Sequence, residues 1–88
     1  MPKYLPTFEQ VLRRQRLMDQ MMETCDVDSL AAVRLDGGLA FSEARTKCRY
    51  CLHERACHEW LRFTPDADRA PDFCPNVDFF ASCRRRYS

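Results

Sequence analysis

The stretch KCRYCLHERACHEW, residues 47–60, places three cysteines within ten positions, and a fourth follows in DFCPN, residues 72–76. Clustered cysteines of this kind form disulfides, a redox-active dithiol, a zinc site or an iron-sulfur cluster. The four cysteines are Cys48, Cys51, Cys57 and Cys74. Each of these structures implies a different function, so the group that the sulfurs hold decides what the protein does.

A chain of this size usually needs a crosslink or a bound group for stability. We expect one domain over residues 1–88, and the hydrophobic core of so short a chain gives only marginal stability. The N-terminus has no apolar run of signal-peptide length, and no stretch approaches the roughly 20 apolar residues of a membrane span. We therefore expect a cytoplasmic protein, in which thiols stay reduced and clustered cysteines bind metal more often than each other.

The pattern of apolar residues predicts helices and no strand of useful length. The first helix spans about 7–24 and begins with a capping box formed by Thr7 and Gln10. A brief second helix starts at Asp26 or Asp28 and stops at the two glycines 37–38. The methionines of the first helix, at positions 18, 21 and 22, form an apolar stripe that suits either the core or a partner helix.

The second half of the chain carries the cysteines on shorter elements. Ser42 caps a third helical segment that includes Cys48 and Cys51, and a fourth helix spans about 54–63. Residues 64–76 are rich in proline and aspartate and form a loop, after which a last helix runs from Val77 to about Arg86, capped by Asn76. The predicted fold is an all-α domain of four to five short helices with a long loop, stapled by a four-cysteine metal site.

Helical spacing predicts how the cysteines meet. Cys48 and Cys51 lie three residues apart and project from one face near a helix end, while Cys57 lies just past the turn. Trp60 and Leu61 follow on the same side of the fourth helix, where they would shield the site from water. The loop would bring in the fourth cysteine.

The spacing C-x2-C-x5-C-x16-C favours an iron-sulfur cluster over the alternatives. Structural zinc prefers two close cysteine pairs, and this chain has one such pair. Cluster ligands commonly come as a local group of three plus a distant cysteine, often followed by proline, as Cys74 is by Pro75. Disulfides suit the even cysteine count but not the missing signal peptide, and a redox dithiol belongs at a strand-to-helix junction.

The subpattern C-x2-C-x5-C also resembles the cluster-binding stretch of WhiB-like regulators and of the iron-sulfur DNA glycosylases. This resemblance covers about ten residues and implies a [4Fe-4S] cofactor. The tryptophan-glycine turn and the helix-hairpin-helix segment of those families are absent from this chain. A WhiB-like ligand set would use Cys25 in place of Cys74.

A resemblance over most of the chain is carried by the segments MDQMMETCDVDSL, ARTKCRYC, ACHEWL and APDFCPNVDFF. In order and spacing they are similar to a family of small uncharacterised proteobacterial proteins. The family signature falls on Cys48, Cys51, Cys57, Trp60, Leu61, Cys74 and Asn76. The family has apolar residues where this chain has Cys25 and Cys83, which favours these two cysteines as core thiols. The resemblance implies a bacterial cytosolic protein with a four-cysteine site.

Charged residues near the cysteines have two interpretations. The basic residues expected to lower thiolate pKa values and to offset the negative site are Arg45, Lys47, Arg49 and Arg55. A second basic run, Arg13, Arg14 and Arg16, is predicted to form a solvated helix face on which Glu9 pairs with Arg13. His53 and His58 are predicted to be surface histidines rather than ligands.

The residue types exclude some functions and leave others open. A net charge of +1 lacks the basic excess of nucleic-acid-binding domains, although the three C-terminal arginines 84–86 could touch phosphate or an acidic partner. The sequence has no nucleophile elbow, phosphate loop or metal-water motif, so we expect no enzyme.

The leading hypothesis is a cytosolic [4Fe-4S] protein that acts as a redox-, O2- or NO-responsive regulator or accessory of another protein. A structural zinc-binding interaction module is the second, and a disulfide-stabilised helical domain the third.

Overall fold

The structure is a computed structural model that describes residues 7–85. Its elements, in chain order, are α1 (Phe8–Thr24), α2 (Ser29–Arg34), the 3-10 turn η1 (Leu35–Gly38), α3 (Leu39–Arg49), α4 (Glu54–Phe63) and α5 (Val77–Ser82). Within these residues the only β-type pairing is an isolated antiparallel bridge between Val27 and Arg84. The predicted all-α fold is confirmed, and none of the described helices is long and apolar enough to cross a membrane.

Helix α1 begins where the capping box predicts. The backbone N–H of Gln10 donates to Oγ1 of Thr7 over 3.1 Å, and the backbone N–H of Thr7 donates to Oε1 of Gln10 over 2.8 Å. These two bonds satisfy donors that the first turn of a helix leaves unpaired. The methionines at positions 18, 21 and 22 are buried, so the apolar stripe belongs to the core.

The turns between the first three helices use an aspartate cap and two glycines with positive φ. Asp28 caps α2 through its carboxylate, which accepts from the N–H groups of Leu30 and Ala31. Gly37 and Gly38 have φ values of 65° and 96°, a region that favours glycine, and they reverse the chain into α3.

Two predicted helix boundaries are wrong, each for a local reason. Helix α3 starts at Leu39 directly after Gly38, so Ser42 lies inside the helix and does not cap it. Helix α5 ends at Ser82 rather than near Arg86, because the backbone that follows pairs with the α1–α2 turn. Asp28 N–H donates to the carbonyl of Cys83 over 2.8 Å, and Arg85 N–H donates to that of Asp26 over 2.9 Å. Arg86 itself lies outside the described residues.

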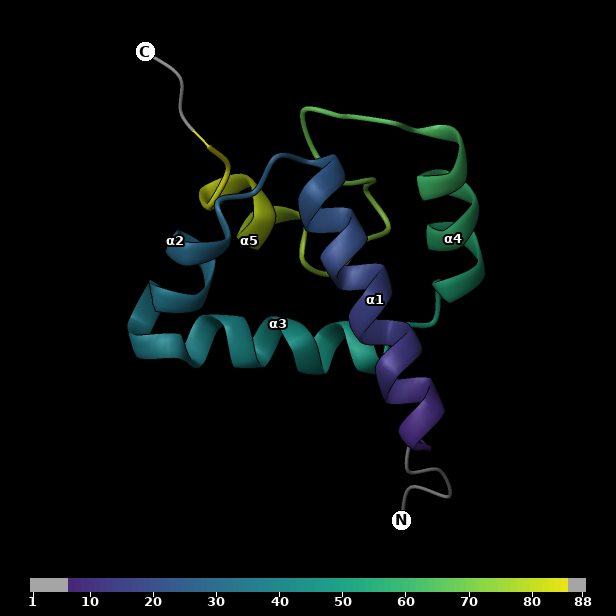
Figure 1. Cartoon of the computed structure of the whole chain (residues 1–88), viewed down its shortest axis with the longest axis horizontal. Helices are drawn as coiled ribbons and strands as arrows, with labels where there is room; N and C mark the ends of the chain where they lie inside the picture. The colour runs from purple at the N-terminus through teal and green to yellow at the C-terminus, as the bar shows by residue number, and fades with distance from the viewer. Residues whose placement is uncertain (1–6, 86–88) are drawn as a thin grey trace.

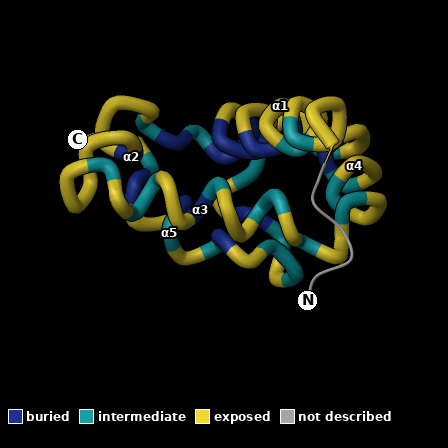
Figure 2. The backbone as a smooth tube through the Cα atoms, turned by 90° about the horizontal axis from the view of Figure 1, so that it is seen from below, coloured by how far each residue is buried: buried dark blue, intermediate teal, exposed yellow. Residues whose placement is uncertain are grey.

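Helix α1 is the central element, and the others pack around it (Figure 1). It crosses α3, with α4 on one side and α2 and α5 on the other, and the segment 64–76 connects α4 to α5 without helix or strand. Seen from below, buried positions concentrate on the inner face of the C-terminal half of α1 (Figure 2). The buried apolar residues are Leu17, Met18, Met21, Met22, Cys25, Val27, Ala32, Ala44, Leu61, Ala70, Phe80 and Cys83. The core therefore depends on side chains from all parts of the described chain.

Candidate metal centre

All four predicted site cysteines line one pocket. Cys48 comes from the last turn of α3, Cys51 from the turn that follows, Cys57 from the first turns of α4 and Cys74 from the segment 64–76. The remaining lining residues are Leu17, Met18, Met21, Phe73, Pro75, Asn76 and Phe80. We call this space, which has a volume of about 30 Å³, the cysteine pocket. The tertiary structure thus brings together four cysteines that are up to 26 positions apart in the sequence.

The Cys48–Cys51 pair is placed by a turn and not by a helix face. Helix α3 ends at Arg49, and the N–H of Cys51 donates to the carbonyl of Cys48 over 3.2 Å. The N–H of His53 then donates to Sγ of Cys51 over 3.3 Å. The predicted common helix face is therefore wrong, and a compact turn brings the two cysteines to the same pocket.

Helix α4 supplies Cys57 to the cysteine pocket, but Trp60 and Leu61 do not shield the pocket as predicted. Trp60 is half-buried and Leu61 is buried on the same side of α4 as Cys57, as the spacing predicts. Neither residue lines the cysteine pocket. The apolar wall comes instead from α1 and from the phenylalanines on either side of Cys74, at positions 73 and 80. The apolar wall is present, but Trp60 and Leu61 do not form it.

Asn76 has a role different from the one predicted. Its side chain is 3% exposed and makes no capping bond to α5. Its Nδ2 donates to the carbonyl of Ala44 in α3 over 2.8 Å. This bond joins the loop, two residues after Cys74, to the helix that carries Cys48. Asn76 therefore fixes the position of the fourth cysteine relative to the other three.

Arg14 contacts the backbone of the cysteine segment, although the sequence predicts it on a solvated face. Its side chain is 19% exposed, and Nη1 donates to the carbonyls of Cys48 and Cys51 over 3.0 and 2.7 Å. Its Nε lies 3.4 Å from Oε1 of Glu54 at the start of α4. Arg13 also forms an ion pair with Glu54, across the α1–α4 interface. Arg14 could have been found from spacing, because it continues the i+3, i+4 pattern of Leu17, Met18 and Met21.

Burial favours the protonated thiols of Cys48, Cys57 and Cys74 in the absence of metal. It raises the pKa of Cys48 to about 11 and that of Cys57 to about 12, and neighbouring cysteines add to both shifts. Burial also raises the pKa of Cys74. Arg14 opposes the shift at Cys48 and Cys57, so it supplies the positive charge that the sequence assigns to Arg45, Lys47, Arg49 and Arg55. A metal that binds here must displace protons.

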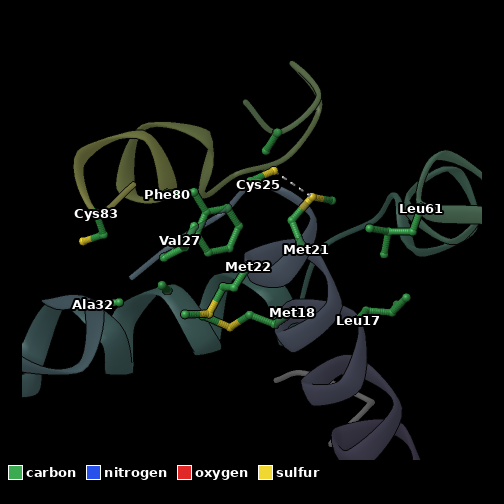
Figure 3. Close-up of a cluster of buried hydrophobic side chains, with 12 residues drawn as sticks. Leu17, Met18, Met21, Met22, Cys25, Val27, Ala32, Leu61, Phe80 and Cys83 are labelled. Carbon is green, nitrogen blue, oxygen red and sulfur yellow. Dashed lines mark hydrogen bonds between the residues drawn. The ribbon is translucent and has the colours of Figure 1, made fainter. Parts of the chain in front are cut away.

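The two other cysteines belong to the hydrophobic core. Cys25 and Cys83 are 2% and 5% exposed, and neither lines the cysteine pocket. Sγ of Cys25 lies 3.9 Å from Sδ of Met21, and Cys83 belongs to the same core cluster as Val27 and Phe80 (Figure 3). All six cysteines are free thiols in the structure. Their burial agrees with the expectation of core thiols.

The histidines lie outside the pocket. His53 and His58 are exposed, as predicted, and the ring of His53 lies 5.6 Å from that of Phe73. Among residues 7–85, no three His, Cys, Asp or Glu side chains are arranged to hold a single metal ion. The donor chemistry of the cysteine pocket, four thiols with apolar walls, is that of iron-sulfur and structural zinc sites.

A family model described as a family of unknown function, DUF6455, matches residues 5–86 of the chain. The chain therefore belongs to this family, in agreement with the resemblance to an uncharacterised family noted from its sequence. No curated protein and no solved structure shows significant similarity to the chain. The site must be interpreted from its own residues.

Proposed function

We propose that this member of the DUF6455 family is a small cytoplasmic bacterial [4Fe-4S] protein that regulates or assists another protein in response to redox state, O2 or NO. The proposed ligands are Cys48, Cys51, Cys57 and Cys74. The observation that carries the proposal is the convergence of these four thiols on one apolar pocket. Nothing in the arrangement calls for catalysis, so the proposed role is not enzymatic.

The pocket walls suit an iron-sulfur cluster. Apolar side chains on α1 and the phenylalanines near Cys74 limit the access of water, which affects both the potential and the lability of a cluster. The N–H of His53 already donates to Sγ of Cys51, and such bonds to cluster sulfurs also set the potential. Cys74 lies on a segment without helix or strand, which would bring the fourth ligand to a cluster.

The attachment of the loop suggests how a cluster would regulate a partner. The segment 64–76 is attached to the rest of the described chain by bonds that include Ala67 N–H to the carbonyl of Thr24, the Asn76 bond to α3 and the ion pair of Asp68 with Arg84. A cluster would add a covalent link from Cys74 to the cysteines of α3 and α4. Loss of the cluster in response to an oxidant or NO would remove that link and release the loop, which changes the surface offered to a partner protein.

The C-terminal arginines give little support to nucleic-acid binding. Arg84 pairs with Asp68 over 3.3 Å, and Arg85 pairs with Asp26 over 3.2 Å. These ion pairs use charge that would otherwise meet phosphate. The proposed partner is therefore another protein.

Anaerobic purification with iron and acid-labile sulfide analysis tests the proposal. We expect a brown protein with about four irons and four sulfides per chain. The Cys57→Ser variant should lose the cluster, while Cys83→Ala, which changes a core cysteine outside the pocket, should keep it. A colourless wild-type protein without iron or sulfide would overturn the proposal.

A structural zinc site is the second candidate, and the small volume of the cysteine pocket favours it. A cavity of about 30 Å³ is closer to the size of a single ion than to that of a cluster. One zinc per chain, no visible absorption and no redox response would identify this function, a helical interaction module stapled by zinc. A free-thiol count near zero under denaturing conditions would instead identify the disulfide-stabilised domain.

A further inference from the structure

Arg14 connects the segments that carry three of the four pocket cysteines. Its guanidinium bonds to two carbonyls, of Cys48 in the last turn of α3 and of Cys51 in the following turn. Its Nε lies 3.4 Å from the carboxylate of Glu54, in the first turn of α4. Cys57 lies three residues after Glu54 on the same helix. One half-buried side chain from α1 therefore sets the end of α3, the turn and the start of α4 relative to one another.

The bonding partners of Arg14 explain why an arginine is placed there. The Cys48 carbonyl lies in the last turn of α3, at the negative end of the helix dipole, and the Cys51 carbonyl lies in the turn that follows. The planar guanidinium can donate to two such oxygens and to a carboxylate at once, whereas a lysine ammonium is a point charge without this fixed geometry. Removal of Arg14 would leave the Cys48 and Cys51 carbonyls without these charged donors.

The guanidinium of Arg14 also places a positive charge within hydrogen-bond distance of the backbone of two pocket cysteines, with its Nε toward Glu54. A cluster with four thiolate ligands carries net negative charge, which increases by one on reduction. A fixed cation beside it stabilises the reduced state more than the oxidised state, because Coulomb energy scales with the charge.

We infer that Arg14 is a positioning residue of the centre, which holds the Cys48–Cys51 turn in its binding geometry and raises the reduction potential of the bound cluster. The effect on the reduction potential rests on the proposed [4Fe-4S] function. The role of Arg14 in holding the Cys48–Cys51 turn applies to the protein with or without a cluster.

Three variants separate the charge of Arg14 from its geometry. Arg14→Gln removes both, Arg14→Lys keeps the charge without the planar fork, and Arg13→Gln is the matched control. Arg13 is the adjacent residue, pairs with the same Glu54 and is 52% exposed, but it makes no bond to the cysteine backbone.

The potential is measured by anaerobic titration with dithionite in the presence of redox mediators. We expect Arg14→Gln to be reduced at a more negative potential than the wild type, and Arg14→Lys and Arg13→Gln to stay close to it. Loss of iron to a chelator should be on the order of tenfold faster in both Arg14 variants, the effect of removing one hydrogen bond to a charged group. Equal potentials and equal rates for Arg14→Gln and Arg13→Gln would overturn the inference.

Hydrogen exchange in the metal-free protein tests the positioning role independently of any cluster. The N–H groups of Cys51 and His53 are bonded within the turn, so they should exchange faster in both Arg14 variants than in Arg13→Gln. If the wild type holds no iron, the proposed function fails, and this exchange still decides whether Arg14 holds the turn. Unchanged exchange at these two amides would refute the positioning role.

Discussion

Cys25 and Cys83 lie inside the hydrophobic core, whereas the other four cysteines lie half-buried around the cysteine pocket. Both groups contact α1, and residues such as Met21 and Phe80 belong to the core and to the pocket wall at once. The difference lies in how the thiols are grouped. A core thiol packs among carbon atoms like a small apolar residue, while the four pocket thiols line a common space.

Substitution of single cysteines should give the largest contrast between the two groups. Cys57→Ala removes one of the four pocket thiols and should abolish stoichiometric metal binding, because the remaining three leave the centre open to solvent and exchange. Cys25→Ala and Cys83→Ala should retain the wild-type metal content. Metal analysis after anaerobic purification checks both expectations, and equal losses in all three variants would show that the two groups do not differ.

Truncation of a core methionine tests whether the hydrophobic core can be weakened without loss of metal from the cysteine pocket. Met22 is buried in the core and does not line the cysteine pocket. Met22→Ala should lower the free energy of unfolding by about 2–5 kcal/mol, through lost apolar contacts and the cavity that remains. Urea unfolding measures the change. Metal content per folded chain should stay the same, and a lower content would link the core to the site.

High pH should weaken the metal-free protein through the pocket thiols. Their pKa values are raised by burial to about 11 for Cys48 and about 12 for Cys57, so the folded state favours the protonated form. This contribution to stability is complete below the ordinary cysteine pKa near 9 and is lost as pH rises through 11 to 12. Urea midpoints at pH 7, 9 and 10.5 in the presence of a reductant should therefore fall above pH 9. In Cys57→Ala the decrease should be less steep, and an equal slope would contradict this assignment.

Asn76→Ala should lower stability moderately and should also affect metal binding at the cysteine pocket, because Asn76 anchors the segment that carries Cys74. The substitution leaves the buried carbonyl of Ala44 without its side-chain donor, which costs about 1–3 kcal/mol of unfolding free energy. Cys74 also loses the bond that fixes its segment, so bound metal should be released faster to a chelator. Thr46→Ala is the control, since it removes an exposed side-chain bond to Ser42 on the same helix. Equal release rates in the two variants would mean that Asn76 does not position Cys74.

The smallest effect is expected at the start of α1, far along the helix from the core methionines. Thr7→Ala removes the capping box and should cost about 1 kcal/mol, while Thr7→Ser should cost less because the hydroxyl remains. Thermal unfolding distinguishes the variants. Neither should alter metal content, and a change would indicate that the end of α1 affects the pocket.

The sequence predicts the helices better than their ends. The capping box at Thr7, the cap at Asp28 and the bounds of α4 follow from local hydrogen-bonding and apolar spacing, which neighbouring residues determine. The start of α3 and the end of α5 do not. At α3 two glycines with positive φ allow an earlier start, and at α5 the backbone pairs with a turn more than 50 residues earlier in the chain.

The same division holds at the site. The spacing of Cys48, Cys51 and Cys57 identifies three residues that must lie close together, because they occupy one turn and the two helix ends beside it. Only the tertiary structure decides that Cys74 joins them, that α1 closes the pocket and that Asn76 and Arg14 bond to the backbone of α3. The reason is physical: local spacing fixes which side chains share a turn, whereas contacts between distant segments depend on how the helices pack and on which buried carbonyls still need a donor.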